Sequence, residues 1–383
     1  MQKRFTPDAG GMFPEWEEVE FGKLFRRRSE KNGEEFGVDK TISVATMYFK
    51  PEGNKADEKS LPRYKVMRTG DIAFEGHINK HFKHGRFVLN NIGDGIISPI
   101  FEVLQPVSEL SKEVPEFWKY YINYEPVMGK ILAKCANTGI MMNRLAIKDF
   151  YKQKIKVPCI EEQRKIAAAL AAYDEMIAVK TAKLETWQEC KKRMVKEIFG
   201  RTKRFKDDDG MEFPEWEEKT LGTVVSITTG KLNANEMVDG GQFDFYTSGV
   251  DVFKIDKAAF NGPAITVAGN GANVGCLHLA DGKFNAYQRT YVLQDFLACR
   301  EYIYAAIEVK LPNVIKKYKR GSAIPYIVMD MLADLKIPLP CMEEQQKIGS
   351  FLAEIDKEIQ IQKEFIKTYA EGKKRMMREL MEG

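Results

Sequence analysis

Two stretches of the chain repeat apolar residues at alternating spacings of four and three, the pattern of a coiled-coil helix. Eight of ten positions in each stretch are apolar, and the polar exceptions fall at matching places: Lys180 and Lys191, then Gln362 and Lys373. We therefore expect two long helices, each with one apolar seam. The apolar seam positions are Ile166, Leu170, Tyr173, Ile177, Leu184, Trp187, Met194 and Ile198, then Ile348, Leu352, Ile355, Ile359, Ile366, Tyr369, Met376 and Leu380.

The order of these helices along the chain favours antiparallel pairing. Pro158 and Pro340 mark their starts, and the second helix begins where the region after the first one ends. Helices of about 39 residues span roughly 58 Å, so an antiparallel return avoids a long linker. Lys180 and Gln362 then meet near the middle, where we expect them to fix the register at some cost in stability. Homodimerisation is the alternative, disfavoured because the chain supplies the second helix itself.

The helices belong to an internal repeat. Glu161-Glu162-Gln163 returns as Glu343-Glu344-Gln345, and 16 of the 38 positions in 161–198 are identical at an offset of 182. The acidic pairs stand in the first helical turns, where negative charge complements the helix dipole. The duplication therefore includes the whole length of each predicted helix.

A second block of the repeat lies upstream. Phe13-Pro14-Glu15-Trp16 returns as Phe213-Pro214-Glu215-Trp216, and 11 of the 19 positions in 4–22 are identical at an offset of 200. Residues 23–138 and 223–320, between the shared blocks, show little similarity. The chain therefore contains two copies of a constant–variable–constant arrangement. This duplication indicates that one architecture occurs twice and performs the same function on two different targets. The alternative is an old duplication that serves stability alone.

Composition places the chain among globular proteins of two domains. Its 383 residues are 44% hydrophobic and 30% charged, and the excess of charge suits long solvated helices. A net charge of +4 does not by itself indicate nucleic acid. No leader-like or membrane-spanning apolar run is present, so we expect a cytoplasmic protein. The cysteines are too dispersed for a zinc or disulfide framework and fit a reducing compartment: Cys135, Cys159, Cys190, Cys276, Cys299 and Cys341.

Motifs that would carry catalysis are missing from the sequence. It has no phosphate-binding G-x-x-x-x-G-K-[ST] loop and no amino-methyltransferase motif. The glycine-rich segment Gly269–Gly275 follows the strand-like Ala264–Ala268 but has the wrong spacing for a dinucleotide loop, so we expect a hairpin there. We therefore predict no cofactor and no enzymatic activity for this chain.

Three of the four histidines, His77, His81 and His84, are clustered. On a helix this spacing could place them on one face as a metal triad. The surrounding Lys80 and Lys83 favour a basic loop instead, so we predict no metal site.

Candidate DNA contacts fall into two groups. Basic and hydroxyl side chains near Gly139 and its equivalent, Gly321, suit phosphate contacts; they are Lys134, Thr138, Arg144, Lys317, Lys319, Arg320 and Ser322. Base edges would be read by amide and basic side chains of the variable regions; these candidates are Lys80, Lys83, Arg86, Asn270, Asn273, Gln288 and Arg289. Each of these residue types, taken alone, is more often an ordinary surface residue than a DNA contact.

The duplicated order of these motifs resembles the type I restriction-modification specificity-subunit family over essentially the whole chain. Besides the repeated blocks, Gly70-Asp71-Ile72 and Ile265-Thr266-Val267 carry the resemblance. It implies an α+β fold with two mixed α/β target-recognition domains separated by two long antiparallel coiled-coil helices, related by a pseudo-two-fold internal repeat. The implied divisions are recognition domains 1–158 and 201–340 and spacer helices 159–200 and 341–383.

The resemblance also implies the function. Each domain would read one half of a split target in double-stranded DNA, and the helices would set the gap between the halves. The helices would dock two methyltransferase subunits, which bind S-adenosylmethionine, and motor/nuclease subunits using ATP would complete the complex. None of those cofactors would bind this chain. The competing hypotheses are a scaffold that does not bind DNA and a metal-dependent nuclease using His77, His81 and His84.

Overall fold

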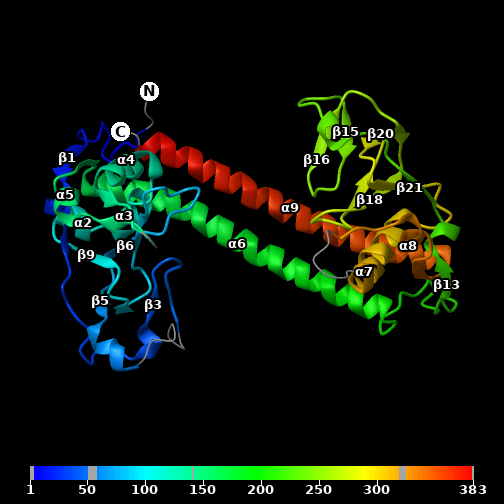
Figure 1. The fold of residues 1–383 in the computed structure, drawn as a ribbon, viewed down its shortest axis with the longest axis horizontal. Helices are drawn as coiled ribbons and strands as arrows, with labels where there is room; N and C mark the ends of the chain where they lie inside the picture. The colour runs from blue at the N-terminus through cyan, green and yellow to red at the C-terminus, as the bar shows by residue number, and fades with distance from the viewer. Residues whose placement is uncertain (1–3, 51–57, 140–141, 319–324, 382–383) are drawn as a thin grey trace. The chain divides into compact units, whose positions relative to one another are not determined.

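The structure is a computed structural model that describes residues 4–50, 58–139, 142–318 and 325–381. The chain forms two compact units (Figure 1). Unit 1 comprises Met1–Val179 and Phe365–Gly383, and unit 2 comprises Lys180–Glu364. Each unit contains part of both long helices. The predicted division of the chain into recognition domains and spacer helices stays a prediction. No helix within the described ranges is long and apolar enough to cross a membrane.

Unit 1 is a mixed α/β structure. Its strands are β1 (Glu17–Glu20), β2 (Phe25–Arg27), β3 (Ile42–Ser43), β4 (Tyr48–Phe49), β5 (Lys65–Met67), β6 (Ile72–Glu75), β7 (Arg86–Leu89), β8 (Gly95–Ile97), β9 (Glu102–Pro106), β10 (Ala136–Asn137), β11 (Arg144–Leu145) and β12 (Lys154–Val157). Its short helices are α1 (Phe21–Leu24), η1 (Val38–Lys40), η2 (Glu58–Arg63), α2 (Glu109–Lys112), α3 (Pro115–Tyr121), α4 (Glu125–Cys135) and α5 (Ile147–Tyr151).

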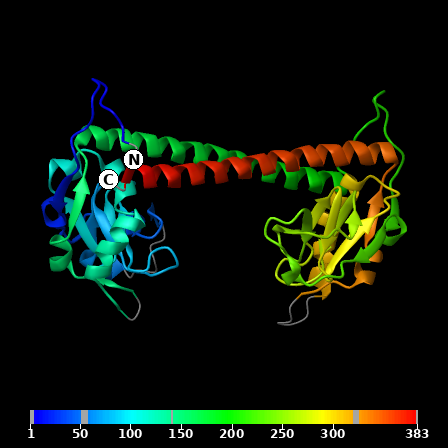
Figure 2. The ribbon, with the colours of Figure 1, turned by 90° about the horizontal axis from the view of Figure 1, so that it is seen from above.

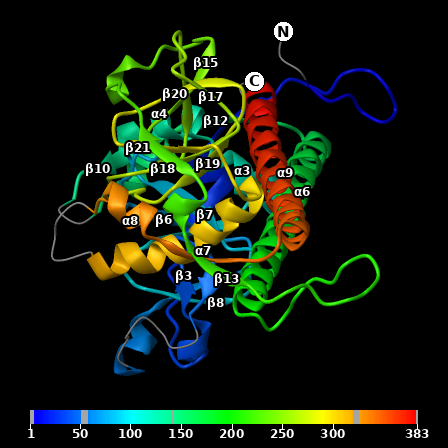
Figure 3. The same ribbon diagram turned by 90° about the vertical axis from the view of Figure 1, so that its right-hand side faces the viewer.

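Unit 2 is also mixed, and several of its elements are labelled in Figure 3. Its strands are β13 (Glu217–Thr220), β14 (Ser226–Thr229), β15 (Phe243–Tyr246), β16 (Val252–Ile255), β17 (Phe260–Asn261), β18 (Ala264–Ala268), β19 (Leu277–Ala280), β20 (Lys283–Ala286), β21 (Thr290–Gln294) and β22 (Lys336–Leu339). Apart from the parts of the two longest helices, its helices are η3 (Leu221–Thr223), η4 (Ala234–Glu236), α7 (Arg300–Tyr318) and α8 (Met329–Ala333).

The two units share one scaffold. A four-stranded antiparallel sheet has the order β2-β9-β6-β7 in unit 1 and β14-β21-β18-β19 in unit 2. A two-stranded ladder pairs β1 with β12 and β13 with β22, and Glu17 opposite Val157 corresponds to Glu217 opposite Leu339. The variable regions differ around this scaffold. Unit 1 adds two-stranded sheets, whereas unit 2 adds the four-stranded sheet β16-β15-β20-β17.

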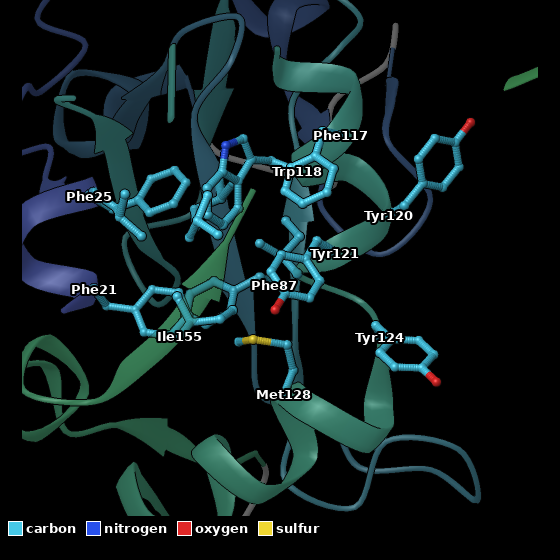
Figure 4. Close-up of a cluster of buried hydrophobic side chains, with 14 of the residues drawn as sticks. Phe21, Phe25, Phe87, Phe117, Trp118, Tyr120, Tyr121, Tyr124, Met128 and Ile155 are labelled. Carbon is cyan, nitrogen blue, oxygen red and sulfur yellow. The ribbon is translucent and has the colours of Figure 1, made fainter. Parts of the chain in front are cut away.

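Aromatic side chains fill the main core of unit 1 (Figure 4). Phe25 and Trp118 are fully buried and meet edge to face, with ring centroids 5.1 Å apart. Two of the buried rings bond to backbone carbonyls: Trp118 Nε1 donates to Leu110 O, and Tyr121 Oη donates to Lys156 O. Because no polar group of these rings is left without a partner, the core gains apolar burial without the cost of an unpaired donor.

The two long helices, α6 (Ile160–Phe199) and α9 (Met342–Met381), run antiparallel within each unit. In unit 1 the start of α6 lies beside the end of α9 (Figure 2), with Leu170 and Leu380 in one core cluster. In unit 2 Ile198 and Ile348 share a cluster, so the end of α6 meets the start of α9. Every predicted seam position is buried or half-buried. The α+β class, the two mixed units and the antiparallel helices are confirmed.

Two polar seam positions form ion pairs that the sequence reading missed. Lys373 Nζ on α9 lies 2.5 Å from Asp174 Oδ1 on α6, and Lys191 Nζ on α6 lies 2.8 Å from Asp356 Oδ1 on α9. The two pairs are equivalent under the repeat. Gln362 is 3% exposed, and its Oε1 accepts no hydrogen bond from the described residues. The expected meeting of Lys180 with Gln362 stays a prediction.

The repeated sequence blocks meet at a buried carboxylate in each unit. Glu344, which is fully buried, accepts hydrogen bonds from Arg204 Nη2 at 2.9 Å and Trp216 Nε1 at 2.8 Å. In unit 1 Glu162 accepts in the same way from Arg4 at 2.8 Å and Trp16 at 3.1 Å. The Arg-Phe and Phe-Pro-Glu-Trp motifs therefore hold the upstream arm onto the first turn of a long helix. These carboxylates have specific partners beyond the helix dipole.

Candidate nucleic-acid interface

In unit 2 the central strand β18 leads into a hairpin whose loop is residues 269–276. It pairs antiparallel with β19, so the hairpin predicted for the glycine-rich segment is confirmed. Gly269 follows the strand and donates its N–H to Arg289 O at 2.8 Å. A Cβ at this position would lie 2.4 Å from the same carbonyl. Only glycine therefore lets the hairpin approach the neighbouring chain this closely.

That neighbouring chain is a β-turn between β20 and β21. Its closing bond runs from Thr290 N–H to Tyr287 O at 2.8 Å. The central residues are Gln288 and Arg289, and Gln288 N–H donates to Leu232 O at 2.8 Å. Both central side chains are exposed. The backbone of the turn is thus held at several points while its side chains remain available to a ligand.

Three of the four predicted base readers of unit 2 converge at one cavity. Asn270, Gln288 and Arg289 line a cavity of about 240 Å³ together with Tyr326. Asn273, the fourth, is exposed on the same hairpin and is not among the residues lining this cavity.

Sequence reasoning missed Tyr326, whose side chain is 63% exposed. Its backbone forms a bridge with Asn270, which places the ring beside the predicted readers. The repeat offset of 182 maps Tyr326 onto Arg144, a candidate in unit 1. This equivalence with Arg144 could have identified Tyr326 as a candidate from the sequence. It was missed because a tyrosine and an arginine do not resemble each other in residue type.

Unit 1 brings its candidates together at the matching place. The loop between β6 and β7 carries Lys80 and Lys83, both exposed. Asn143 N–H donates to Gly76 O at 2.9 Å, which joins this loop to the segment between β10 and β11. Lys134, Thr138 and Arg144, on or beside that segment, are also exposed.

Charged groups on neighbouring elements influence one another at this edge of unit 1. Burial raises the pKa of Glu125, at the start of α4, while the nearby Lys83 and His84 side chains act in the opposite direction. The basic loop therefore lies close enough to α4 for electrostatic interaction.

The Arg86 guanidinium is already bound inside unit 1. Nε lies 2.7 Å from Glu75 Oε2, and Nη2 donates to Ala45 O at 2.6 Å. The Phe82 ring lies under the same guanidinium, and the distance from Arg86 Cζ to the ring centroid is 5.3 Å. A contact with DNA would have to compete with these internal interactions.

The histidine cluster lies in the loop between β6 and β7 and forms no helix. His77 Nδ1 faces Glu75 Oε1 at 3.6 Å. Across the described part of the chain, no three His, Cys, Asp or Glu side chains meet in an arrangement that could hold a metal ion.

The second phosphate-contact group is described only in part. Lys317 is exposed near the end of α7. Lys319, Arg320 and Ser322 lie outside the described residues.

Two units with one scaffold, each presenting unlike exposed polar residues at equivalent loops, define a duplicated binding protein. Comparison with known proteins identifies the kind. Residues 101–186 and 214–368 match the family described as the type I restriction modification DNA specificity domain. The match includes more than half of the chain, which therefore belongs to the type I restriction-modification specificity-subunit family.

Individual relatives agree with this assignment. The type I restriction enzyme EcoDI specificity subunit of Escherichia coli is 35% identical over 146 residues, covering 37% of this chain and 32% of that subunit. The chain thus matches about a third of that relative's length. The MjaVIII specificity subunit of Methanocaldococcus jannaschii is 25% identical over 327 residues, covering 76% of this chain and 74% of that protein.

A solved structure shares the fold. The crystal structure of the type I S subunit from M. genitalium has a TM-score of 0.71 at 16% identity, covering 99% of this chain and 100% of that one. Specificity subunits are in general non-catalytic and act in type I complexes with DNA and other subunits.

Proposed function

We propose that this chain reads a bipartite target in double-stranded DNA, with one half-site for each unit. The observation that carries the proposal is that the two units share one sheet scaffold but have different residues at equivalent loops. Lys80 and Lys83 stand on the loop after β6, whereas Asn270 and Asn273 stand on the loop after the equivalent β18. Lysines suit phosphates and guanine, and amides suit adenine. Two unlike sets of readers call for two unlike half-sites.

We further propose that phosphate contacts and base contacts are divided between segments. Lys134, Thr138 and Arg144 in unit 1 and Lys317, Lys319, Arg320 and Ser322 in unit 2 would position the backbone. The loop and turn residues would contact the bases. Phosphate contacts fix orientation without reading sequence, so replacing them should weaken all targets alike.

The long helices would dock two methyltransferase subunits, and motor/nuclease subunits would join them. Support comes from large apolar side chains that α6 and α9 expose in unit 1. Met176 is 38% exposed, Val179 52% and Phe365 41%. Exposed apolar groups of this size are typical of protein contacts when they gather on one surface. The chain itself would carry no catalytic step and bind no cofactor.

Methylome sequencing tests the proposal. The chain would be expressed with a cognate methyltransferase subunit in a host that lacks its own modification. We expect a split, asymmetric methylated motif that disappears when the chain is omitted. Methylation that is absent, or unchanged without the chain, would favour a scaffold that does not bind DNA.

A separate measurement tests the non-catalytic role. The purified chain should leave DNA uncut with or without divalent metal. Cleavage that is lost on His81→Ala would instead support the nuclease hypothesis.

A further inference from the structure

Asn233 connects a helix cap to the β-turn that carries two predicted readers. It precedes η4 and forms a capping box with Glu236: its side chain accepts from the Glu236 backbone N–H, and its own N–H donates to the Glu236 carboxylate at 2.8 Å. Because the cap uses the side-chain oxygen as acceptor, the orientation of the Asn233 amide is fixed. Gln288 Nε2 donates to that same oxygen at 3.2 Å.

The polarity of the Gln288 amide follows from this contact. With one Nε2 hydrogen bound to Asn233, Gln288 retains Oε1 as an acceptor and one N–H as a donor. Adenine presents the complementary pair in the major groove, a donor at N6 and an acceptor at N7. A glutamine that is free to rotate would first have to lose that freedom on binding, at a cost in affinity.

Arg289, the next residue of the turn, offers only donors. No side-chain partner of its guanidinium occurs among the described residues, and the side chain is exposed. Its backbone is held through the carbonyl that accepts from Gly269 N–H at 2.8 Å. Donors in a planar fork match the two acceptors of guanine, O6 and N7. The turn therefore presents an adenine-type pattern beside a guanine-type pattern.

We propose that Asn233 is a specificity-determining positioning residue of unit 2. It holds the Gln288 amide in the orientation that reads adenine, while Arg289 reads a guanine in the same half-site. Asn233 acts through Gln288 and does not contact DNA. The inference rests on the proposed function, in which unit 2 reads one half of the target.

Three substitutions at Asn233 separate positioning from capping. Asn233→Asp keeps an oxygen that can both cap η4 and accept from Gln288. Asn233→Ser keeps a capping oxygen, but its shorter side chain cannot reach Gln288. Asn233→Ala removes both contacts. Gln288→Ala and Arg289→Ala remove the two readers directly, and both residues are exposed.

The experiment is methylome sequencing of each variant, expressed as the full chain with its cognate methyltransferase subunit. In Asn233→Ala, Asn233→Ser and Gln288→Ala, discrimination should fall about tenfold at one adenine position of one half-site. Asn233→Asp should retain the wild-type motif. Arg289→Ala should relax a guanine position in that same half-site.

The outcomes distinguish the inference from the proposed function. A wild-type chain that directs no methylated motif would overturn the proposed function. A wild-type motif that Asn233→Ser leaves unchanged would show that Asn233 acts only as a cap. Relaxation by Gln288→Ala at a base other than adenine, or at no position, would also overturn the inference. If Asn233→Ala fails to fold, the methylated motifs directed by Asn233→Ser and Gln288→Ala still test whether Asn233 positions Gln288.

Discussion

The buried carboxylate of unit 2 makes a quantitative prediction about the repeated motif. Glu344 is fully buried, whereas the Arg204 side chain that binds it is 20% exposed. Arg204→Met would strand a charged carboxylate in the core with Trp216 as its remaining side-chain partner. Removing one partner of a buried ion pair costs about 3–5 kcal/mol. The lower value corresponds to roughly 150-fold in an opening equilibrium, since about 1.4 kcal/mol is tenfold.

The reverse substitution should cost less. Glu344→Gln keeps an acceptor for Trp216 and leaves Arg204, which can turn toward water. The expected loss is therefore about 1–2 kcal/mol, the range for a single hydrogen-bond partner. The order of the two variants tests the cause, because simple loss of one ion pair would make them equal.

Hydrogen–deuterium exchange of the first turns of α9 measures this opening locally. Arg204→Met should accelerate exchange there by about two orders of magnitude, and Glu344→Gln by much less. Lys336→Met is the matched control, because it breaks an exposed pair with Glu218 (side chains 71% and 63% exposed) and should change little. The reasoning would be refuted if the first turns of α9 exchanged at the same rate in Arg204→Met as in this control. Slower exchange in Arg204→Met than in Glu344→Gln would also refute it.

Three further predictions follow from the packing. Gly269→Ala should lower the melting temperature and relax only the half-site read by unit 2, because its Cβ would lie 2.4 Å from Arg289 O; an unchanged motif would count against the close approach. Burial raises the pKa of the Cys135 thiol from 9.0 to about 11. The folded chain therefore binds the thiol proton more tightly than the unfolded chain does, so the free energy of unfolding should fall as the pH rises from about 9 to about 11. Denaturant titrations of Cys135→Ala should lack this component. Four residues added to both α6 and α9 should lengthen the unread spacer, by methylome sequencing, without changing either half-site; an unchanged spacer contradicts the idea that the helices set the gap.

Candidate site residues were harder to predict than elements. Arg86 and Arg289 look alike in the sequence, yet Glu75 and Ala45 bind the first, while the second has an exposed side chain. Tyr326 reaches the cavity only because its segment bridges to Asn270. Exposure and partnership depend on segments far away in the chain, and residue type alone does not report them.

The sequence by itself determined the duplication, the two long helices and their seam. These features are periodic, so each residue and its neighbours within a few turns carry the signal. Only the tertiary structure decided what Glu162 and Glu344 do. In the sequence they are acidic residues in a first helical turn, but in the fold each is buried against an arginine and a tryptophan more than a hundred residues upstream. Contacts between such distant segments depend on how the whole chain folds, and local periodicity does not encode them.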